Sequence, residues 1–233
     1  MTLRTHLNPD LCVGPDRLTR WNSAPNRRRS FHNLHRIARY VQSYRAGTVL
    51  DLRLSADLAI AMRDDVRQLT ALPWFSAMAV IEGNRLLYAA YAPDFPSDQP
   101  HSVMSISKMA VNLLIGRLWE DGRIGLQETL GEILPWIGPG YHGATVQDAL
   151  DMNVHNDFDE DYSNPDSAAF RREVALGMRL SAGAEPTNRA FLASIGLAPG
   201  CSDTRNPTET CLYTSANTDV LAFAAEARAG RPL

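Results

Sequence analysis

The sequence predicts an α+β protein in which one antiparallel β-hairpin comes before a series of helices. Residues 75–81 form an apolar run after Pro73, and residues 85–91 form a second such run. The residues between them, 82–84 (EGN), are typical of a tight turn. From residue 106 onward, apolar residues recur at helical spacing in several segments. Strands followed by helices indicate an α+β fold rather than alternating βα units.

The composition is that of an ordinary globular protein, with 233 residues, 45% hydrophobic and 21% charged. These values exclude disorder, collagen and coiled coil as descriptions of the whole chain. The net charge of −3 gives no sign of a nucleic-acid surface. Arg27-Arg28-Arg29 is the one basic cluster, and it is shorter than a basic patch. Lys108 is the only lysine among 23 basic residues.

The N-terminal part of the chain predicts an arm followed by two helices. Residues 1–30 are polar and rich in proline, and we expect them to be extended. The rest, 31–233, is predicted to form the main domain, with 109–212 mainly its helical part. Apolar spacing predicts helices over 31–45 and 56–70. His32 and His35 lie on the first of them, where a surface or packing role is favoured over metal binding.

Targeting signals and cysteine pairing are not indicated. The first nine residues lack the apolar core of a secretory signal. No segment has about 18 uninterrupted apolar residues, so we expect no membrane span. Cys12, Cys201 and Cys211 have neither zinc spacing nor an even count, which favours reduced thiols in the cytoplasm.

The segment after the hairpin predicts a buried central helix. Apolar residues crowd all sides of residues 106–118, and Gly122 ends the pattern. Thr145 and Asp148 resemble a capping box that opens another helix. The remaining predictions are a short helical or irregular piece at 125–137, helices over 168–180 and 217–229, and mostly loop over 181–210.

Ser105-Ile106-Ser107-Lys108 is the segment that suggests chemistry. Positions three apart at the start of a helix face the same side, so Ser105 and Lys108 are neighbours. Backbone N–H groups at a helix N-terminus favour a developing negative charge. Desolvation lowers the pKa of a lysine and lets it act as a base, which an arginine cannot do. The alternative is a serine that caps the helix and a solvated lysine.

Two other polar segments are compatible with a functional role or with a simpler structural one. Tyr213, at the entry to the last helix, could relay a proton, or it could be a packed aromatic residue. The acidic residues within 157–161 lack the glycine and spaced glutamate of an EF-hand. We therefore interpret them as a solvated loop and predict no metal site and no cofactor.

Taken together, these motifs resemble the serine β-lactamase and penicillin-binding-protein superfamily. That superfamily carries S-x-x-K at the start of its central helix and Tyr-x-Asn or Tyr-x-Ser before a later one. Here SISK occupies 105–108 and YTS occupies 213–215. Longer stretches resemble one branch, the 6-aminohexanoate-dimer hydrolases (nylon-oligomer hydrolases) and related esterases. These stretches are SISKMAVNLLIGRLWEDGRIGL, GYHGATVQDALDM with FDEDYSNPDS, and YTSANTDVLAF.

The resemblance implies a β-lactamase-like fold, an antiparallel sheet with a helical domain, and a role for each matching residue. Ser105 corresponds to the acylated nucleophile, Lys108 to its general base, and Tyr213 to the group that passes a proton to the leaving group. The residues implied in substrate binding are Tyr162, Ser215 and Asn217.

The sequence also departs from the family pattern. Asn153-Val154-His155 replaces a Thr-Ser-Gly turn. No Lys/His-x-Gly motif follows Tyr213, so the sheet is expected to be incomplete in this chain. A second chain or a homo-oligomer could complete it.

Three functions remain in order of preference. The first is a serine hydrolase acting on a small linear amide or ester through an acyl-enzyme. The second is a truncated, catalytically weak or inactive relative that serves as a binding or assembly subunit. The third is a β-lactamase or D,D-peptidase.

Overall fold

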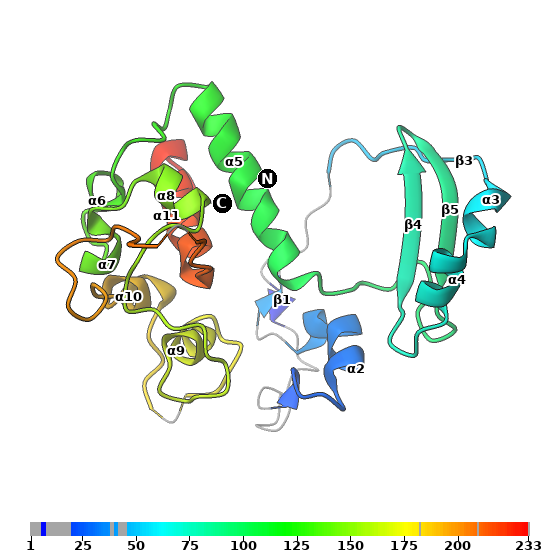
Figure 1. Cartoon of the computed structure of the whole chain (residues 1–233), viewed down its shortest axis with the longest axis horizontal. Helices are drawn as coiled ribbons and strands as arrows, with labels where there is room; N and C mark the ends of the chain where they lie inside the picture. Colours follow the sequence, from blue (N-terminus) through cyan, green and yellow to red (C-terminus); the bar gives the residue numbers. More distant parts are fainter. Residues whose placement is uncertain are drawn as a thin grey trace. The chain divides into compact units, whose positions relative to one another are not determined.

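The computed structural model describes most of the chain as two compact units, Met1–Ser102 and Val103–Leu233 (Figure 1). None of the helices in the described segments is both long and apolar enough to cross a membrane. The described residues are 6–7, 20–37, 40–41, 46–181, 183–208 and 210–232. Most of the predicted arm, Cys12 and part of the helix predicted over 31–45 lie outside them.

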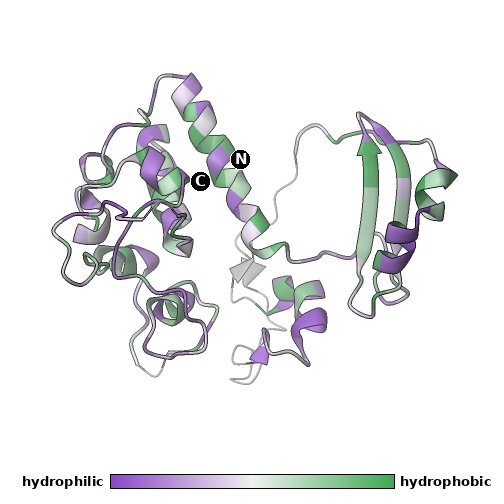
Figure 2. Ribbon diagram, viewed as in Figure 1, coloured by the Kyte–Doolittle hydropathy of each residue, from purple (hydrophilic) through white to green (hydrophobic). Residues whose placement is uncertain are grey.

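The predicted hairpin is confirmed and belongs to a small mixed sheet in the first unit. Strand β4 (Ala77–Glu82) pairs antiparallel with β5 (Arg85–Tyr91). Gly83 in the turn has a φ of +58°, a conformation that glycine adopts without steric cost. Strand β3 (Arg53–Leu54), which the sequence analysis missed, pairs parallel with β5 and gives the order β3-β5-β4. Both long strands are largely hydrophobic in Figure 2.

The prediction of a helix over 31–45 is wrong. Helix α2 covers Arg27–His32, a 3₁₀ turn η1 covers Leu34–Arg36, and Tyr40–Val41 is strand β2. Strand β2 pairs antiparallel with β1 (His6–Leu7). Such long-range pairing overrides local helix propensity, which is a weak preference.

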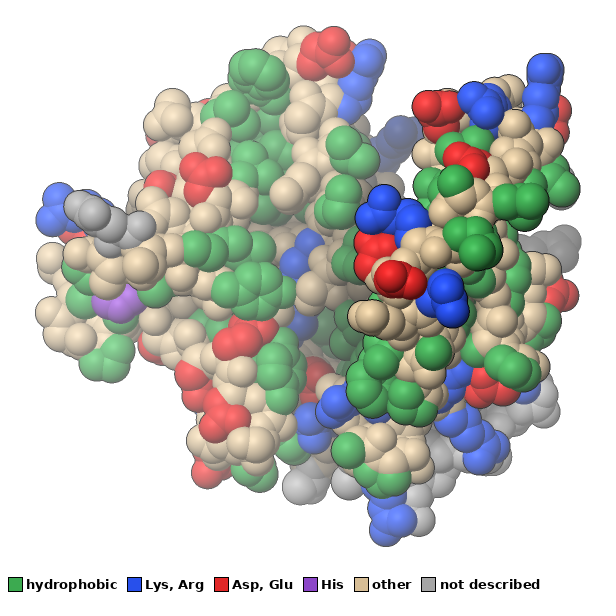
Figure 3. All heavy atoms as spheres, turned by 45° about the vertical axis from the view of Figure 1, so that its right-hand side comes forward, with side chains coloured by type: hydrophobic (Ala, Val, Ile, Leu, Met, Phe, Trp, Pro, Cys, Tyr) green, Lys and Arg blue, Asp and Glu red, His purple; other side chains and the backbone are tan. Residues whose placement is uncertain are grey.

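The helix predicted over 56–70 is interrupted once. It forms α3 (Leu58–Met62) and α4 (Asp64–Thr70), and Arg63 between them has extended backbone angles. The guanidinium of Arg63 binds the carboxylate of Asp65 in the first turn of α4. Both sides of this break are exposed. On the face of the molecule drawn in Figure 3, charged and hydrophobic side chains lie next to one another.

The helix predicted over 106–118 forms, but its predicted burial is wrong. A 3₁₀ turn η2 (Met104–Lys108) leads into α5 (Met109–Glu120). Ile115 and Leu118 are buried, whereas Met109 is 61% and Leu113 is 73% exposed. The reason is that α5 packs along one face against the last helix, α11 (Ser215–Ala229).

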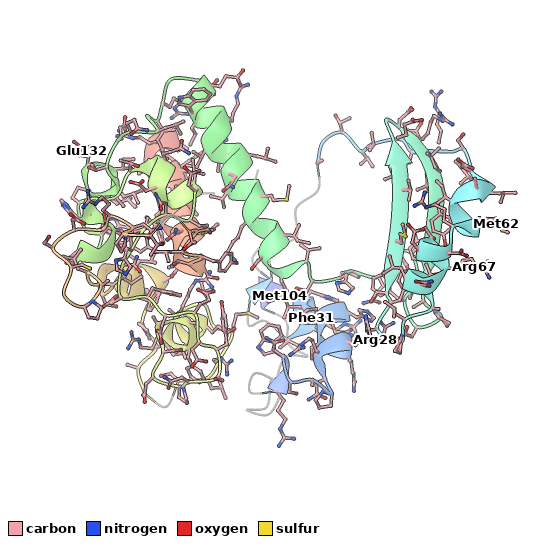
Figure 4. The ribbon with its side chains drawn as sticks, in the orientation of Figure 1. Arg28, Phe31, Met62, Arg67, Met104 and Glu132 are labelled. Atoms are coloured by element: carbon pink, nitrogen blue, oxygen red, sulfur yellow. The ribbon has the colours of Figure 1, made fainter. Side chains whose placement is uncertain are left out.

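The core of the second unit surrounds α11. This helix packs against α5, α6 and α8, and the residues that it buries include Val220, Leu221 and Ala224. Four helices of the unit begin after a residue whose side chain caps them, and the predicted capping box of Thr145 and Asp148 is confirmed. Thr129 forms a second capping box with Glu132, and Glu132 is labelled in Figure 4. The shorter helices are α6 (Leu130–Ile133), α7 (Pro139–His142), α8 (Val146–Leu150), α9 (Ala168–Ala175) and α10 (Asn188–Ala193).

Candidate active site

Ser105 and Lys108 are neighbours, as their spacing predicts. Lys108 Nζ donates a hydrogen bond to Ser105 Oγ over 2.8 Å. Both residues lie in the 3₁₀ turn η2, where side chains three apart stand above one another. Ser105 is exposed and Lys108 is half-buried, so the lysine does not lie in the apolar core that the sequence suggested. The geometry suits proton exchange between the two groups.

Tyr213 joins this pair from the other end of the unit. Its hydroxyl donates to Ser105 Oγ over 2.9 Å, and Lys108 Nζ lies 5.5 Å from the centre of its ring. Partial burial acts to raise the pKa of Tyr213. Hydrogen bonding with Ser105, Lys108 and Ser215, together with the charge on Lys108, outweighs burial and lowers the pKa below its usual value. A phenol of this kind can give up and regain a proton more readily than a free tyrosine.

The backbone just before Ser105 is in an uncommon conformation. Met104 has a φ of +46°, and Met152 is the one other non-glycine residue with positive φ among those described. Met104 lies at the N-terminal end of the helical segment that continues as α5 (Figure 4). Left-handed angles at a non-glycine residue cost energy and tend to occur at functional sites. Here they direct the chain into the turn that carries Ser105 and Lys108.

A second polar cluster surrounds Glu160, a residue that the sequence analysis treated as solvated. Its Oε2 accepts from the backbone N–H of Ser215 over 3.0 Å. Its Oε1 accepts from both Ser215 Oγ and the Tyr162 hydroxyl, each over 2.5 Å. The Tyr162 and Ser215 oxygens are 3.2 Å apart. The signal that could have found Glu160 is its place two residues before Tyr162.

The environment of Tyr162 keeps its phenol protonated. Burial and the hydrogen bond to Glu160 raise the pKa of Tyr162 to about 12. The hydroxyl of Ser215 lies beside that of Tyr162, and Ser215 also contributes to the lowered pKa of Tyr213. Two hydrogen-bonded clusters therefore neighbour each other within the second unit: one of Ser105, Lys108 and Tyr213, and one of Glu160, Tyr162 and Ser215.

Asn217 lies outside these clusters. It is fully buried, and its Oδ1 accepts from the Tyr141 hydroxyl over 2.7 Å. Its Nδ2 donates to the carbonyl of Ala149 and to Met152 Sδ, at 3.4 and 3.5 Å. The structure thus places Asn217 in the core between α11 and α8, rather than beside Ser105 and Tyr213.

Three carboxylates of the acidic loop accept hydrogen bonds from backbone N–H groups. Asp157 accepts from the N–H of Gly196, Asp159 from Ala168, and Asp161 from Ser163. Among the described residues, no group of three or more His, Cys, Asp or Glu side chains is placed to hold a metal ion. Cys201 and Cys211 are free thiols, and Cys201 Sγ lies 3.6 Å from His155 Nδ1.

The fold and this site together define a β-lactamase-like α+β protein. The Beta-lactamase family matches residues 67–233, and the chain belongs to this family. A curated relative, the 6-aminohexanoate-dimer hydrolase of Paenarthrobacter ureafaciens, is 28% identical over 222 residues. The match covers 94% of this chain and 55% of that protein, so the chain spans about half the length of the relative.

Two solved structures are also similar. A putative 6-aminohexanoate-dimer hydrolase from Bacillus anthracis superimposes with a TM-score of 0.69 and 18% identity, over 91% of this chain and 57% of its own. This likeness supports the β-lactamase-like fold. EstCE1, a hydrolase with promiscuous acyltransferase activity, matches with a TM-score of 0.47 and 22% identity, over 67% of this chain and 42% of its own.

Proposed function

We propose that the protein is a serine hydrolase that cleaves a small linear amide or ester through an acyl-enzyme on Ser105. The observation that carries this proposal is the placement of Ser105 Oγ within 2.8 Å of Lys108 Nζ and 2.9 Å of the Tyr213 hydroxyl. Membership of the Beta-lactamase family and the likeness to a 6-aminohexanoate-dimer hydrolase support it.

The first half of the reaction forms an ester on Ser105. Lys108 in its neutral form takes the hydroxyl proton while Ser105 Oγ attacks the carbonyl carbon. The bond to the leaving amine or alcohol then breaks, and Tyr213 delivers a proton to the leaving atom. Backbone N–H groups at the start of the helical segment favour the negative charge on the carbonyl oxygen.

The second half releases the acid. Water attacks the acyl group, Lys108 and Tyr213 move the proton from water to Ser105 Oγ, and the carboxylic acid leaves. Tyr162 and Ser215 contact the substrate in this proposal, because they border the reacting groups and Tyr162 is 37% exposed. The free thiols of Cys201 and Cys211 favour a reducing compartment, and we place the protein in the cytoplasm.

A fluorophosphonate probe tests the proposal, since it labels a serine only when a base activates it. We expect the wild type to be labelled at Ser105 and Ser105→Ala to be unlabelled. A burst of nitrophenol from a nitrophenyl ester should accompany labelling. Equal labelling of wild type and Ser105→Ala would show that Ser105 is not the nucleophile. A folded wild type that is neither labelled nor turned over would favour the binding or assembly subunit.

We also propose that a second copy or another chain pairs along β4. Among the described strands β4 has a partner on one side only, because the order of the sheet is β3-β5-β4. Its open edge presents unpaired N–H and C=O groups, which favour addition of a strand. Light scattering after gel filtration tests this: a complex of defined size is expected, and a monomer at all concentrations would contradict it.

A further inference from the structure

At the beginning of α11, the carboxylate of Glu160 accepts hydrogen bonds from three donors. The N-cap residue of this helix, Thr214, makes no side-chain capping bond, and Glu160 accepts from the first helical N–H instead, that of Ser215. A carboxylate is favoured at this position by the partial positive charge of a helix N-terminus. The anchoring of Glu160 therefore does not depend on its two hydroxyl partners.

The positions of the hydroxyl protons follow from counting donors. Ser215 and Tyr162 have one hydroxyl proton each, and an ionised carboxylate can only accept. Both hydroxyls lie 2.5 Å from the same oxygen, Glu160 Oε1, so both protons point at it. Neither proton is then left for the 3.2 Å contact between the two hydroxyl oxygens. While these two bonds to Glu160 hold, each oxygen offers lone pairs to a substrate.

We propose that Glu160 is a positioning residue of the active site, which fixes the protons of Tyr162 and Ser215 and makes both oxygens acceptors toward the substrate. This inference rests on the serine hydrolase function proposed above. The acceptor oxygens of Tyr162 and Ser215 can bind a substrate group that donates a hydrogen bond. The N–H of an amide is such a donor, whereas an ester has none, so Glu160 would favour amides over esters.

The loop that carries Glu160 is held on several sides, which makes a fixed geometry possible. Ser167 Oγ donates to the Asp161 carbonyl over 2.5 Å, and Arg179 donates to the Tyr162 carbonyl over 3.3 Å. These bonds come from the N-cap residue of α9 and from the segment after that helix, and they hold the backbone directly after Glu160. The raised pKa of Tyr162, to which the bond with Glu160 contributes, agrees with a proton held on the phenol.

Tyrosine titration tests the proton placement without requiring activity. Tyrosines labelled at the ring carbon that bears the hydroxyl are followed by NMR against pH, with Tyr162 assigned through Tyr162→Phe. In Glu160→Gln we expect the pKa of Tyr162 to fall from about 12 but to stay above 10, because burial remains the larger cause. Asp161→Asn, which removes the neighbouring charge, should leave it unchanged. An unchanged Tyr162 titration in folded Glu160→Gln overturns the inference.

Paired substrates test the consequence for catalysis. With an amide and an ester of the same acyl group, Glu160→Gln should lose about tenfold more kcat/KM on the amide, the effect of one misplaced hydrogen bond. In a background that carries both Tyr162→Phe and Ser215→Ala the same substitution should add little, because Glu160 acts through those two hydroxyls. Equal losses on both substrates would contradict the proposal. Failure of Ser105 labelling in the wild type refutes the hydrolase function alone, and the NMR result still decides the role of Glu160.

Discussion

The hydroxyl of Tyr213 donates to Ser105 Oγ over 2.9 Å, although the two residues lie 108 positions apart in the chain. Lys108 Nζ donates to the same oxygen over 2.8 Å. The oxygen of Ser105 thus lies between an amine and a phenol, each able to take or return a proton. Two of the predictions below depend on how the surrounding residues hold these three groups.

Replacement of Lys108 by arginine should abolish acylation of Ser105 and preserve the fold. Arginine keeps the positive charge but cannot lose a proton, so it cannot accept the proton of Ser105. We expect the rate of labelling by a fluorophosphonate to fall by about 10²–10⁴-fold. The control is Arg117→Lys in α5, where the exposed side chain pairs with Glu120 and Asp121. Labelling of Lys108→Arg at the wild-type rate would exclude Lys108 as the base.

Replacement of Met104 by glycine should relieve backbone strain at the cost of activity. Its φ of +46° is a conformation in which glycine has no steric penalty. We expect the free energy of unfolding to rise by up to about 1 kcal/mol, while acylation slows because the turn before Ser105 is less fixed. Met152→Gly, at the other left-handed residue, should leave the acylation rate unchanged. Urea unfolding and labelling kinetics measure the two effects, and a fall in stability without loss of rate would argue against strain at Met104.

The hairpin and the Ser105–Lys108 contact could be predicted because each depends on residues close in sequence. A turn at Gly83 joins two apolar runs, and a spacing of three brings two side chains together at the start of a helix. Tyr213 could be placed near them only through the family resemblance. The broken helix after His32 and the exposure of Leu113 depend on which segments pack together, and local periodicity does not encode this.

The role of Glu160 could not be predicted from the sequence, for a different reason. Four acidic residues between 157 and 161 look alike as a charge cluster. Three of them accept only from backbone N–H groups in the bonds described above, whereas Glu160 also accepts from the hydroxyls of Ser215 and Tyr162. Only the folded chain distinguishes the one that reaches the site.

Stability at alkaline pH should depend on Tyr162. Its pKa is raised from 10 to about 12 in the folded state, so its contribution is fully present below pH 10 and is lost as the pH rises toward 12. Tyr162→Phe removes this contribution, and its free energy of unfolding should fall less steeply than that of the wild type above pH 10. Urea unfolding at a series of pH values measures the difference. Parallel curves for the two proteins would show that the pKa of Tyr162 is not raised.

Asn217 should prove to be a structural residue. Its Oδ1 accepts from the Tyr141 hydroxyl in the core, where neither group has access to water. Tyr141→Phe leaves a buried acceptor without its donor and should lower the free energy of unfolding by about 1–3 kcal/mol. Asn217→Ala should be destabilising by a similar amount, with KM unchanged in the folded fraction. A large rise in KM without loss of stability would instead support the substrate contact that the family resemblance implies.

The pair of Arg172 and Asp219 should contribute more to stability than the surface ion pairs. Their side chains are 14% and 15% exposed, and the guanidinium binds the carboxylate through two nitrogens at 2.5 and 2.8 Å. Burial acts to lower the pKa of Arg172, but the hydrogen bond and charge of Asp219 outweigh it and raise the pKa.

Arg172→Met leaves a buried carboxylate unpaired and should lower the free energy of unfolding by about 3–5 kcal/mol. Arg63→Met, at an exposed pair with Asp65, should change it by less than about 1 kcal/mol. Arg172→Met combined with Asp219→Leu should regain much of the loss, because no unpaired charge then remains in the core, and a double variant no more stable than Arg172→Met would refute this account.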